Sequence, residues 1–345
     1  MSFRSALCRR WRITLLNPND TIKEQLQLEE AGGGRHIFRV HSLGDPFFSA
    51  IIATLAFLIL VLLAGIAAEL IIKAMPSIRH FGFAFLSSTE WDPSADQYGA
   101  LPFLYGTAVS SAIALMIAVP LSLGVALCLS EMAPEWLSRK LGFMVELLAA
   151  IPSVVYGLWA IFVLGPWLRD WVEPVLSDYF GFIPLFAGPR VSVGMLTAGV
   201  VLAIMVLPYI AAVCTDVFRV VPQSQREAAL ALGATKWEMV RMAVLPYGTS
   251  GIIGAIMLGL GRALGETIAV AMVIGNRPVI SASLFAPSST LASVIANEFV
   301  EAMTELNVAA LIELGLVLLA LGLILNMTAR VLVLGAIQRR FRDAP

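Results

Sequence analysis

Six long apolar runs constrain this sequence more than any other feature. They cover about 47–72, 104–130, 141–165, 191–214, 250–274 and 308–334. Each run is close to the roughly 20 residues that an α-helix needs to cross a bilayer. Hydrophobic residues make up 59% of the chain and charged residues only 14%, whereas soluble domains average about 45–50% apolar residues. We therefore predict an all-α integral membrane protein with six transmembrane helices.

Lys and Arg residues are distributed unevenly between the segments that connect these runs. The tail 1–46, the segments 131–140 and 215–249, and the residues after 334 hold 16 of them, whereas the outer segments hold five. Because cytoplasmic segments carry the excess of Lys and Arg, we expect both termini to be cytoplasmic. The expected organisation is a basic N-terminal tail (1–46), a membrane domain (47–334) and a C-terminal tail (335–345).

Prolines are expected to kink two of the predicted spans. Ile151-Pro152-Ser153 lies in the third run and Leu207-Pro208-Tyr209 in the fourth. Proline removes a backbone hydrogen bond and its ring clashes with the preceding turn, so these positions predict kinks in both helices.

The first outer segment, 73–103, is rich in aromatic residues, proline and glycine. It contains Phe81-Gly82-Phe83 and Trp91-Asp92-Pro93. We expect an ordered loop at the water–lipid boundary, which serves either as an aromatic belt or as a platform for an external partner.

Composition and motifs exclude several function classes. The three cysteines, Cys8, Cys128 and Cys214, are scattered and form no CxxC pair, so neither a disulfide framework nor a zinc site is expected. The chain lacks a GxxxxGK[ST] phosphate-binding loop and is not expected to hydrolyse nucleotide. Its net charge of −1 gives no argument for nucleic acid. We expect no catalytic residues, metal or cofactor in this chain.

The stretch 227–246, EAALALGATKWEMVRMAVLP, is unusually polar for this half of the chain. Its alanines and long side chains favour helix, and Gly233 interrupts it. We expect two short helices joined at Gly233, the second beginning at Ala234 and stopping before Pro246. The distribution of Lys and Arg assigns this elbow to the cytoplasm, where it could serve as a docking lever.

The fifth run contains two charged residues, Arg262 and Glu266, spaced one helical turn apart. An arginine near mid-bilayer costs roughly 2.5–3.5 kcal/mol on insertion scales, so it must face protein or water. One interpretation is an anion site on a translocation path, because the planar guanidinium offers two parallel donors to an oxyanion. Glu266 would then hold Arg262 when the site is empty. The other interpretation is a self-neutralising pair that only permits insertion.

The 227–246 stretch resembles the EAA loop of inner-membrane permease subunits of bacterial binding-protein-dependent ABC importers. In that family the loop forms coupling helices that dock on the ATP-binding subunit. Ala243 departs from the usual isoleucine. The residues that match the motif are Glu227, Ala228, Ala229, Gly233, Leu245 and Pro246.

Three further stretches resemble the PstC-type permeases of phosphate-specific importers: 90–107, 150–157 and 261–267. The likeness covers roughly 47–340. It implies a six-helix type I importer fold and adds Thr267 to Arg262 and Glu266 as substrate-pathway residues. It also implies three kinds of partner in the cytoplasmic (inner) membrane system: a PstA-like second permease, two subunits that bind ATP and Mg, and an extracytoplasmic phosphate-binding protein.

These features predict an ATP-driven permease through which phosphate passes Arg262 while the 227–246 elbow transmits motion. Two alternatives remain open. One is the same machine acting on another oxyanion, such as sulfate, molybdate or a phosphonate. The other is a stand-alone secondary transporter or channel, which would predict an internal repeat between the two halves and gives the elbow no role. A membrane-embedded enzyme is the weakest interpretation.

Overall fold

The computed structural model describes residues 44–342, and all regular elements among them are helical. The predicted tails 1–46 and 335–345 lie outside the described residues, except for helical backbone at 44–46 and 335–342. The chain divides at residues 63 and 64 into two units, which are described separately.

The first unit contributes the beginning of helix α2 (Gly44–Phe81). Every side chain from residue 47 to residue 63 is exposed, and almost all of them are apolar. A helix that is apolar on all sides suits lipid or a protein partner rather than water.

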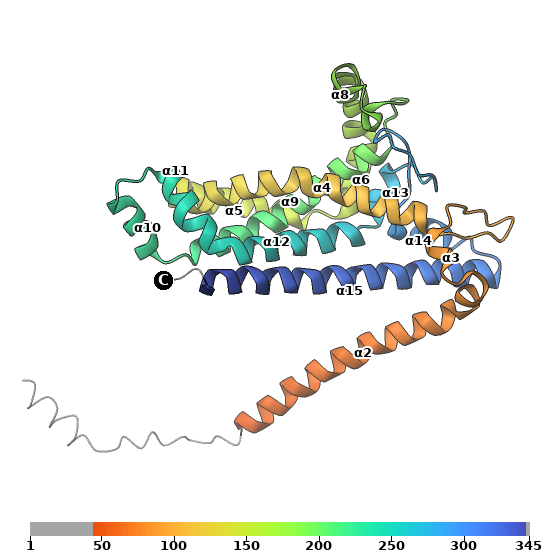
Figure 1. The fold of residues 1–345 in the computed structure, drawn as a ribbon, viewed down its shortest axis with the longest axis horizontal. Helices are drawn as coiled ribbons and strands as arrows, with labels where there is room; N and C mark the ends of the chain where they lie inside the picture. Colours follow the sequence, from red (N-terminus) through yellow and green to blue (C-terminus); the bar gives the residue numbers. More distant parts are fainter. Residues whose placement is uncertain (1–43, 343–345) are drawn as a thin grey trace, which may run out of the picture. The chain divides into compact units, whose positions relative to one another are not determined.

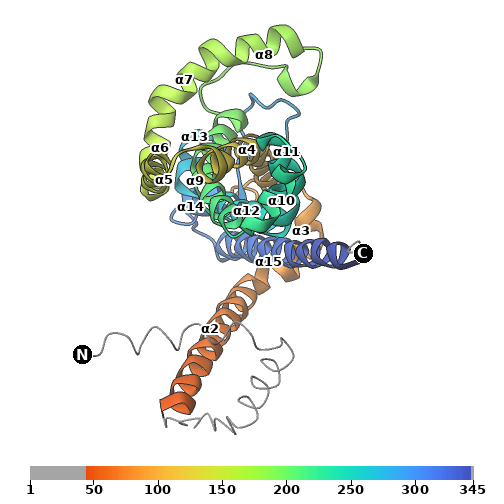
Figure 2. The same cartoon turned by 90° about the vertical axis from the view of Figure 1, so that its left-hand side faces the viewer.

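The second unit is built on long helices that run side by side (Figures 1 and 2). Helix α9 lies among the others and packs against α4, α5, α12 and α13. Helix α15 packs against α12. The bounds are α4 Leu101–Leu127, α5 Glu135–Ala150, α9 Met195–Arg219, α12 Leu245–Gly265, α13 Ile268–Val273 and α15 Glu305–Arg342.

Within residues 44–342, five helices are long and apolar enough to cross a membrane, and a bent pair raises the number to six. The pair is α5 with Ser153–Phe180, and its two arms meet at 87°. The break falls at Ile151 and Pro152, where a kink was predicted. Helix α9, in contrast, continues through Pro208 without a break. The all-α, multi-span fold is therefore confirmed.

The second arm of the bent pair is a chain of short helical segments that leads to α8 (Glu173–Phe180). Two of these segments, η2 and η3, are π-helical turns, which widen the helix locally. The elements are α6 Ser153–Trp159, η2 Ala160–Leu164, α7 Gly165–Trp167, η3 Leu168–Val172 and the 3₁₀ turn η4 Pro184–Phe186.

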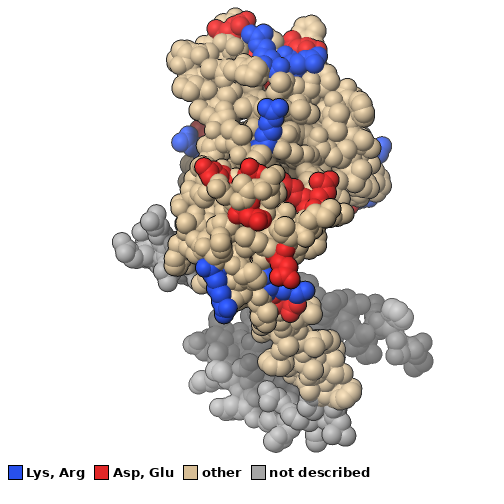
Figure 3. Space-filling view, turned by 90° about the vertical axis from the view of Figure 1, so that its right-hand side faces the viewer, with Lys and Arg blue, Asp and Glu red and all other residues tan. Residues whose placement is uncertain are grey.

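The segment that follows α2 forms an ordered aromatic cluster with α3 (Ala84–Ser87) and α14 (Leu291–Glu298). The Trp91 ring lies 4.9 Å from that of Phe103 and 5.0 Å from that of Tyr98. Asp and Glu side chains gather at this end of the molecule (Figure 3). The exposed acidic residues here are Glu90, Asp92, Asp96 and Glu301 in the loops and Glu305 at the start of α15.

Candidate functional site

The polar elbow consists of two helices joined at a glycine, as the sequence predicted. These are α10 (Gln223–Ala231) and α11 (Lys236–Met239). Gly233 has φ +84°, a left-handed conformation that L side chains rarely adopt, although the space around it is open. Thr235 and Glu238 form a reciprocal capping box at the start of α11.

The prediction that the second helix stops before Pro246 is wrong. A continuous helix runs over Lys236–Gly265, through the π-helical turn η5 (Val240–Val244) into α12. The wider π turn lies just before Pro246 and accommodates a residue that cannot donate a backbone hydrogen bond. Buried Val240 and Val244 anchor this turn in the core. The second helix of the elbow and the span that carries Arg262 therefore form one continuous helix.

The elbow exposes large apolar side chains to its surroundings. They are Leu230, Leu232, Trp237 and Met242, of which Leu232 is 90% exposed. In Figure 1, α10 and α11 lie together at one end of the long helices. Exposed apolar groups clustered in this way mark an interaction surface.

The residues of the EAA-like motif divide between that surface and the core. Glu227, Ala228 and Pro246 are exposed. Ala229 and Leu245 are half-buried and pack against the main hydrophobic core. The motif thus packs one side of the elbow against the core and leaves the other side exposed for a partner.

An ion pair that sequence reasoning did not identify fixes α10 to the π-helical turn η1 (Cys128–Met132), which continues α4. The Arg226 guanidinium donates two hydrogen bonds to Glu131, of 2.7 Å (Nη2 to Oε1) and 3.1 Å (Nε to Oε2). It also donates to the carbonyls of Phe218 and Val221. The two side chains are only 13% and 7% exposed. In the sequence, the only sign of this pair is the position of Glu131 at the end of an apolar run.

Arg262 lies in the last turn of α12, half-buried, facing Tyr209 of α9. Its guanidinium carbon is 4.5 Å from the centre of the Tyr209 ring, a cation–π contact. Tyr209 in turn donates a hydrogen bond of 3.1 Å to the carbonyl of Ala149. The Nε atom of Arg262 is buried without a hydrogen-bond partner among the described residues. A buried donor of this kind is costly unless a ligand or water satisfies it.

The expected helical pairing of Arg262 with Glu266 is not found. Helix α12 ends at Gly265, and Glu266 adopts an extended conformation with ψ 119°. Because the chain leaves the helix, the i, i+4 geometry is lost, and the ion pairs of the described residues do not include these two. The Glu266 carboxylate instead accepts a long hydrogen bond (3.5 Å) from the amide of Ala269, at the start of α13. The expected single span over 250–274 is thus divided between α12 and α13.

The remaining residues of the predicted pathway surround this break. Thr267 is half-buried and its hydroxyl donates to the carbonyl of Gly265 at 3.2 Å. Gly259 packs closely on α9, since a Cβ there would lie 2.7 Å from Ile210. Gly261 and Gly265 face open space, where a Cβ would meet nothing within 4 Å. The break therefore combines an arginine with an unsatisfied donor and adjacent free volume.

The chain matches a model of the family described as "Binding-protein-dependent transport system inner membrane component" over residues 118–342. This match includes the elbow, Arg262 and the break after Gly265. The chain belongs to this family. It is a multi-pass membrane component of an ABC importer, a transport subunit rather than an enzyme, and it works with a separate ATPase and a binding protein.

Curated relatives and a solved structure agree with this assignment. The phosphate transport system permease protein PstC of Mesorhizobium japonicum is 46% identical over 300 residues, covering 86% of this chain and 92% of that protein. The protein of the same name from Haemophilus influenzae is 46% identical over 293 residues, covering 84% and 93%. The MetNI methionine ABC transporter, solved in inward-facing conformations, has 19% identity and a TM-score of 0.50, covering 68% of this chain and 96% of that one. At this identity the MetNI structure supports the fold alone.

Proposed function

We propose that this chain is a permease subunit of an importer that moves inorganic phosphate across the bacterial inner membrane, driven by ATP. The names of its relatives support phosphate as the substrate. The partners proposed are a second, PstA-like permease, two subunits that bind ATP and Mg, and an extracytoplasmic phosphate-binding protein. This chain itself uses no cofactor.

The observation that carries the mechanism is the continuous helix Lys236–Gly265. It connects the elbow to Arg262 across 26 residues, or about 39 Å at the rise of an α-helix. A displacement of the elbow by the ATPase therefore reaches Arg262 through a rigid element. The exposed apolar residues Leu232 and Trp237, with exposed Glu227 nearby, are suited to fill a cleft on the ATPase.

Arg262 is the proposed phosphate-contacting residue of the path. Its buried Nε lacks an acceptor, and a phosphate oxygen would satisfy it with a charge-assisted hydrogen bond. Glu266 and Thr267 lie at the adjacent break between α12 and α13. The role proposed for Glu266 therefore differs from the one expected from the sequence, in which it held Arg262. It does not neutralise Arg262, and its charge instead faces the start of α13, which leaves Arg262 free for an anion.

The opposite end of the second unit is the proposed receiving surface for the binding protein. The aromatic cluster around Trp91 and Phe103 holds its loops in an ordered form. The acidic side chains that surround it (Figure 3) would select a partner with basic residues at its rim.

The experiment that tests this function is phosphate uptake into vesicles that contain the complete transporter. We expect uptake of radiolabelled phosphate only with both ATP and the binding protein. Arg262→Gln should abolish uptake while assembly stays intact, whereas Arg330→Gln, an exposed arginine in α15, should retain it. Unchanged uptake in Arg262→Gln would contradict the proposal that Arg262 contacts phosphate on the transport path. Preferential transport of sulfate or molybdate would contradict phosphate as the substrate.

A second comparison tests the elbow. Glu227→Ala should uncouple ATP hydrolysis from uptake, and Gln225→Ala, exposed on the same helix, should not. Equal coupling in both variants would contradict docking through the motif.

A further inference from the structure

A cavity of about 570 Å³ opens at the end of the α9 helix, away from Arg262. It is formed by the π-helical turn η1 (Cys128–Met132), by α5 and by the last turn of α9. Its volume falls within the range of about 300–1,000 Å³ that is usual for small-molecule pockets. None of the pathway or elbow residues lines it.

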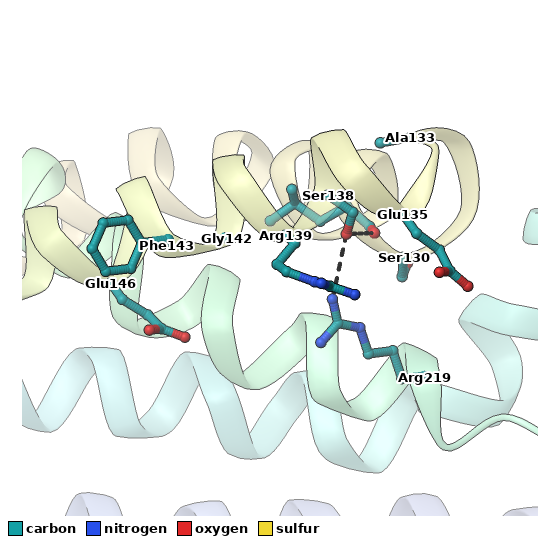
Figure 4. Close-up of a pocket in the computed structure, with 10 residues that line it drawn as sticks. Ser130, Ala133, Glu135, Ser138, Arg139, Gly142, Phe143, Glu146 and Arg219 are labelled. Atoms are coloured by element: carbon teal, nitrogen blue, oxygen red, sulfur yellow. Dashed lines mark hydrogen bonds between the residues drawn. The ribbon is translucent and has the colours of Figure 1, made fainter.

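Two arginines from different helices converge in this cavity. Arg139 comes from α5 and Arg219 from the last turn of α9. In Figure 4 both side chains extend into the space between α5 and α9. Arg219 donates a hydrogen bond of 3.4 Å to the hydroxyl of Ser138, which itself donates to the carbonyl of Leu129 at 2.6 Å. Ser138 therefore orients the Arg219 side chain toward the cavity.

The two positive charges are not neutralised by neighbouring carboxylates. Glu135 and Glu146 also line the cavity, but they lie toward its two ends in Figure 4. No ion pair within 4.0 Å joins either arginine to an acidic group of the described residues. Two like charges that line one cavity repel each other, so an anion bound in the cavity would be stabilised by both.

A third polar group that lines the cavity is the hydroxyl of Ser130. The hydroxyl of Ser130, on the π-helical turn, is buried and makes no hydrogen bond with the described residues. Such turns occur frequently at functional sites, where they redirect side chains. Ser130 thus supplies a free donor to the cavity that the two arginines line.

The outer side of α5 has the character of a membrane–water interface. Trp136 is 62% exposed, and the Lys140 ammonium lies 5.5 Å from the centre of its ring. About one and two turns beyond Lys140, Met144 and Leu147 are exposed. Tryptophan and lysine above an apolar surface are typical of the headgroup level of a bilayer.

We propose that Arg139 and Arg219, with Ser130, form a binding site for a phosphate group, separate from the transport path. Paired guanidinium forks and a hydroxyl donor match the oxygens of a phosphate monoester or diester. Two sources supply this chemistry: the headgroup of an anionic phospholipid, and free inorganic phosphate. The site goes beyond the proposed function and does not depend on it, because it rests on residues outside the elbow and the path.

The test compares the assembled transporter carrying Arg139→Gln or Arg219→Gln with the unmodified complex. In the lipid arm, native mass spectrometry measures retention of phosphatidylglycerol, with a diacylglycerol of the same chains as the phosphate-free lipid. In the second arm, equilibrium binding of radiolabelled inorganic phosphate is measured without ATP or binding protein. This arm uses an Arg262→Gln background, so that the proposed path contributes nothing.

The matched control is Lys140→Gln, which removes a positive charge from the same helix outside the cavity. Loss of one charged hydrogen-bonding group is expected to weaken binding roughly 10- to 100-fold in the arm whose ligand occupies the site. Lys140→Gln should leave that binding unchanged, and diacylglycerol should be retained equally by all variants. Equal retention of phosphatidylglycerol and equal phosphate binding in all variants would overturn the proposal. So would an equal loss in Lys140→Gln, because it would indicate general surface charge rather than a site.

Discussion

The Arg226–Glu131 pair should control the stability of the elbow far more than an ordinary surface pair. Both side chains are largely buried, and Glu131 accepts two hydrogen bonds from the guanidinium. Removing one partner of a buried pair costs about 3–5 kcal/mol, because the other charge is left unpaired. Arg226→Met should cost more than Glu131→Gln, since it also deprives the Val221 carbonyl of its donor.

The assay is hydrogen exchange of the α10 amides in the purified transporter, which reports local opening of that helix. A cost of about 3–5 kcal/mol corresponds to roughly 100- to 4,000-fold faster exchange. The double variant Arg226→Met with Glu131→Met should exchange more slowly than Arg226→Met alone, because no unpaired charge remains.

The control for this prediction is Asp178→Asn, which breaks an exposed pair with Arg190 at 3.4 Å. Exposed pairs are worth about 0–1 kcal/mol, so exchange in α8 should change by less than roughly fivefold. Exchange in α10 that rises by the same small factor in Arg226→Met would refute the reasoning. A double variant whose effect equals the sum of the two single effects would refute it as well, because the groups would then not interact.

Two further predictions concern the backbone of the elbow and a buried carboxyl. Gly233→Ala should destabilise the elbow by about 1–2 kcal/mol, because alanine is strained at the positive φ of this position. Gly254→Ala, in open space within α12, should not destabilise it. Hydrogen exchange of the α10 amides distinguishes the two variants, and equal exchange rates would contradict backbone strain at position 233. Burial raises the pKa of Glu298 above its usual value, and the hydrogen bond from Trp91 lowers it only in part. The folded state therefore holds this proton more tightly, so its stabilising contribution is complete below pH about 4.5 and is lost as the pH rises through the raised pKa. Glu298→Gln should flatten the fall of the thermal midpoint over that range and exposed Glu90→Gln should not; an unaltered profile in Glu298→Gln would contradict the assignment.

The amino-acid sequence predicted the class of fold and the location of the elbow. Long apolar runs admit one solution in a bilayer, because only helices satisfy every backbone group within a short segment. The glycine at position 233 and the break at Pro152 were equally local, since each depends on the backbone preferences of a few residues. Two predictions from backbone preferences were wrong because the chain adopts another local conformation at these positions. Pro246 lies inside a helix because a π turn precedes it, and the helix that carries Arg262 ends one residue before Glu266.

Contacts between distant segments could be known only from the tertiary structure. Arg226 and Glu131 are 95 residues apart, and Arg139 and Arg219 line one cavity from two different helices. Periodicity states which face of a helix is polar, but it does not state which other helix faces it. The contact between Tyr209 and Arg262 likewise follows from the packing of α9 against α12. So does the burial of the Arg262 Nε atom without a hydrogen-bond partner among the described residues. Hydropathy and backbone preference act over a few neighbouring residues and so can be read along the chain, whereas the pairing of buried charges depends on how the helices pack.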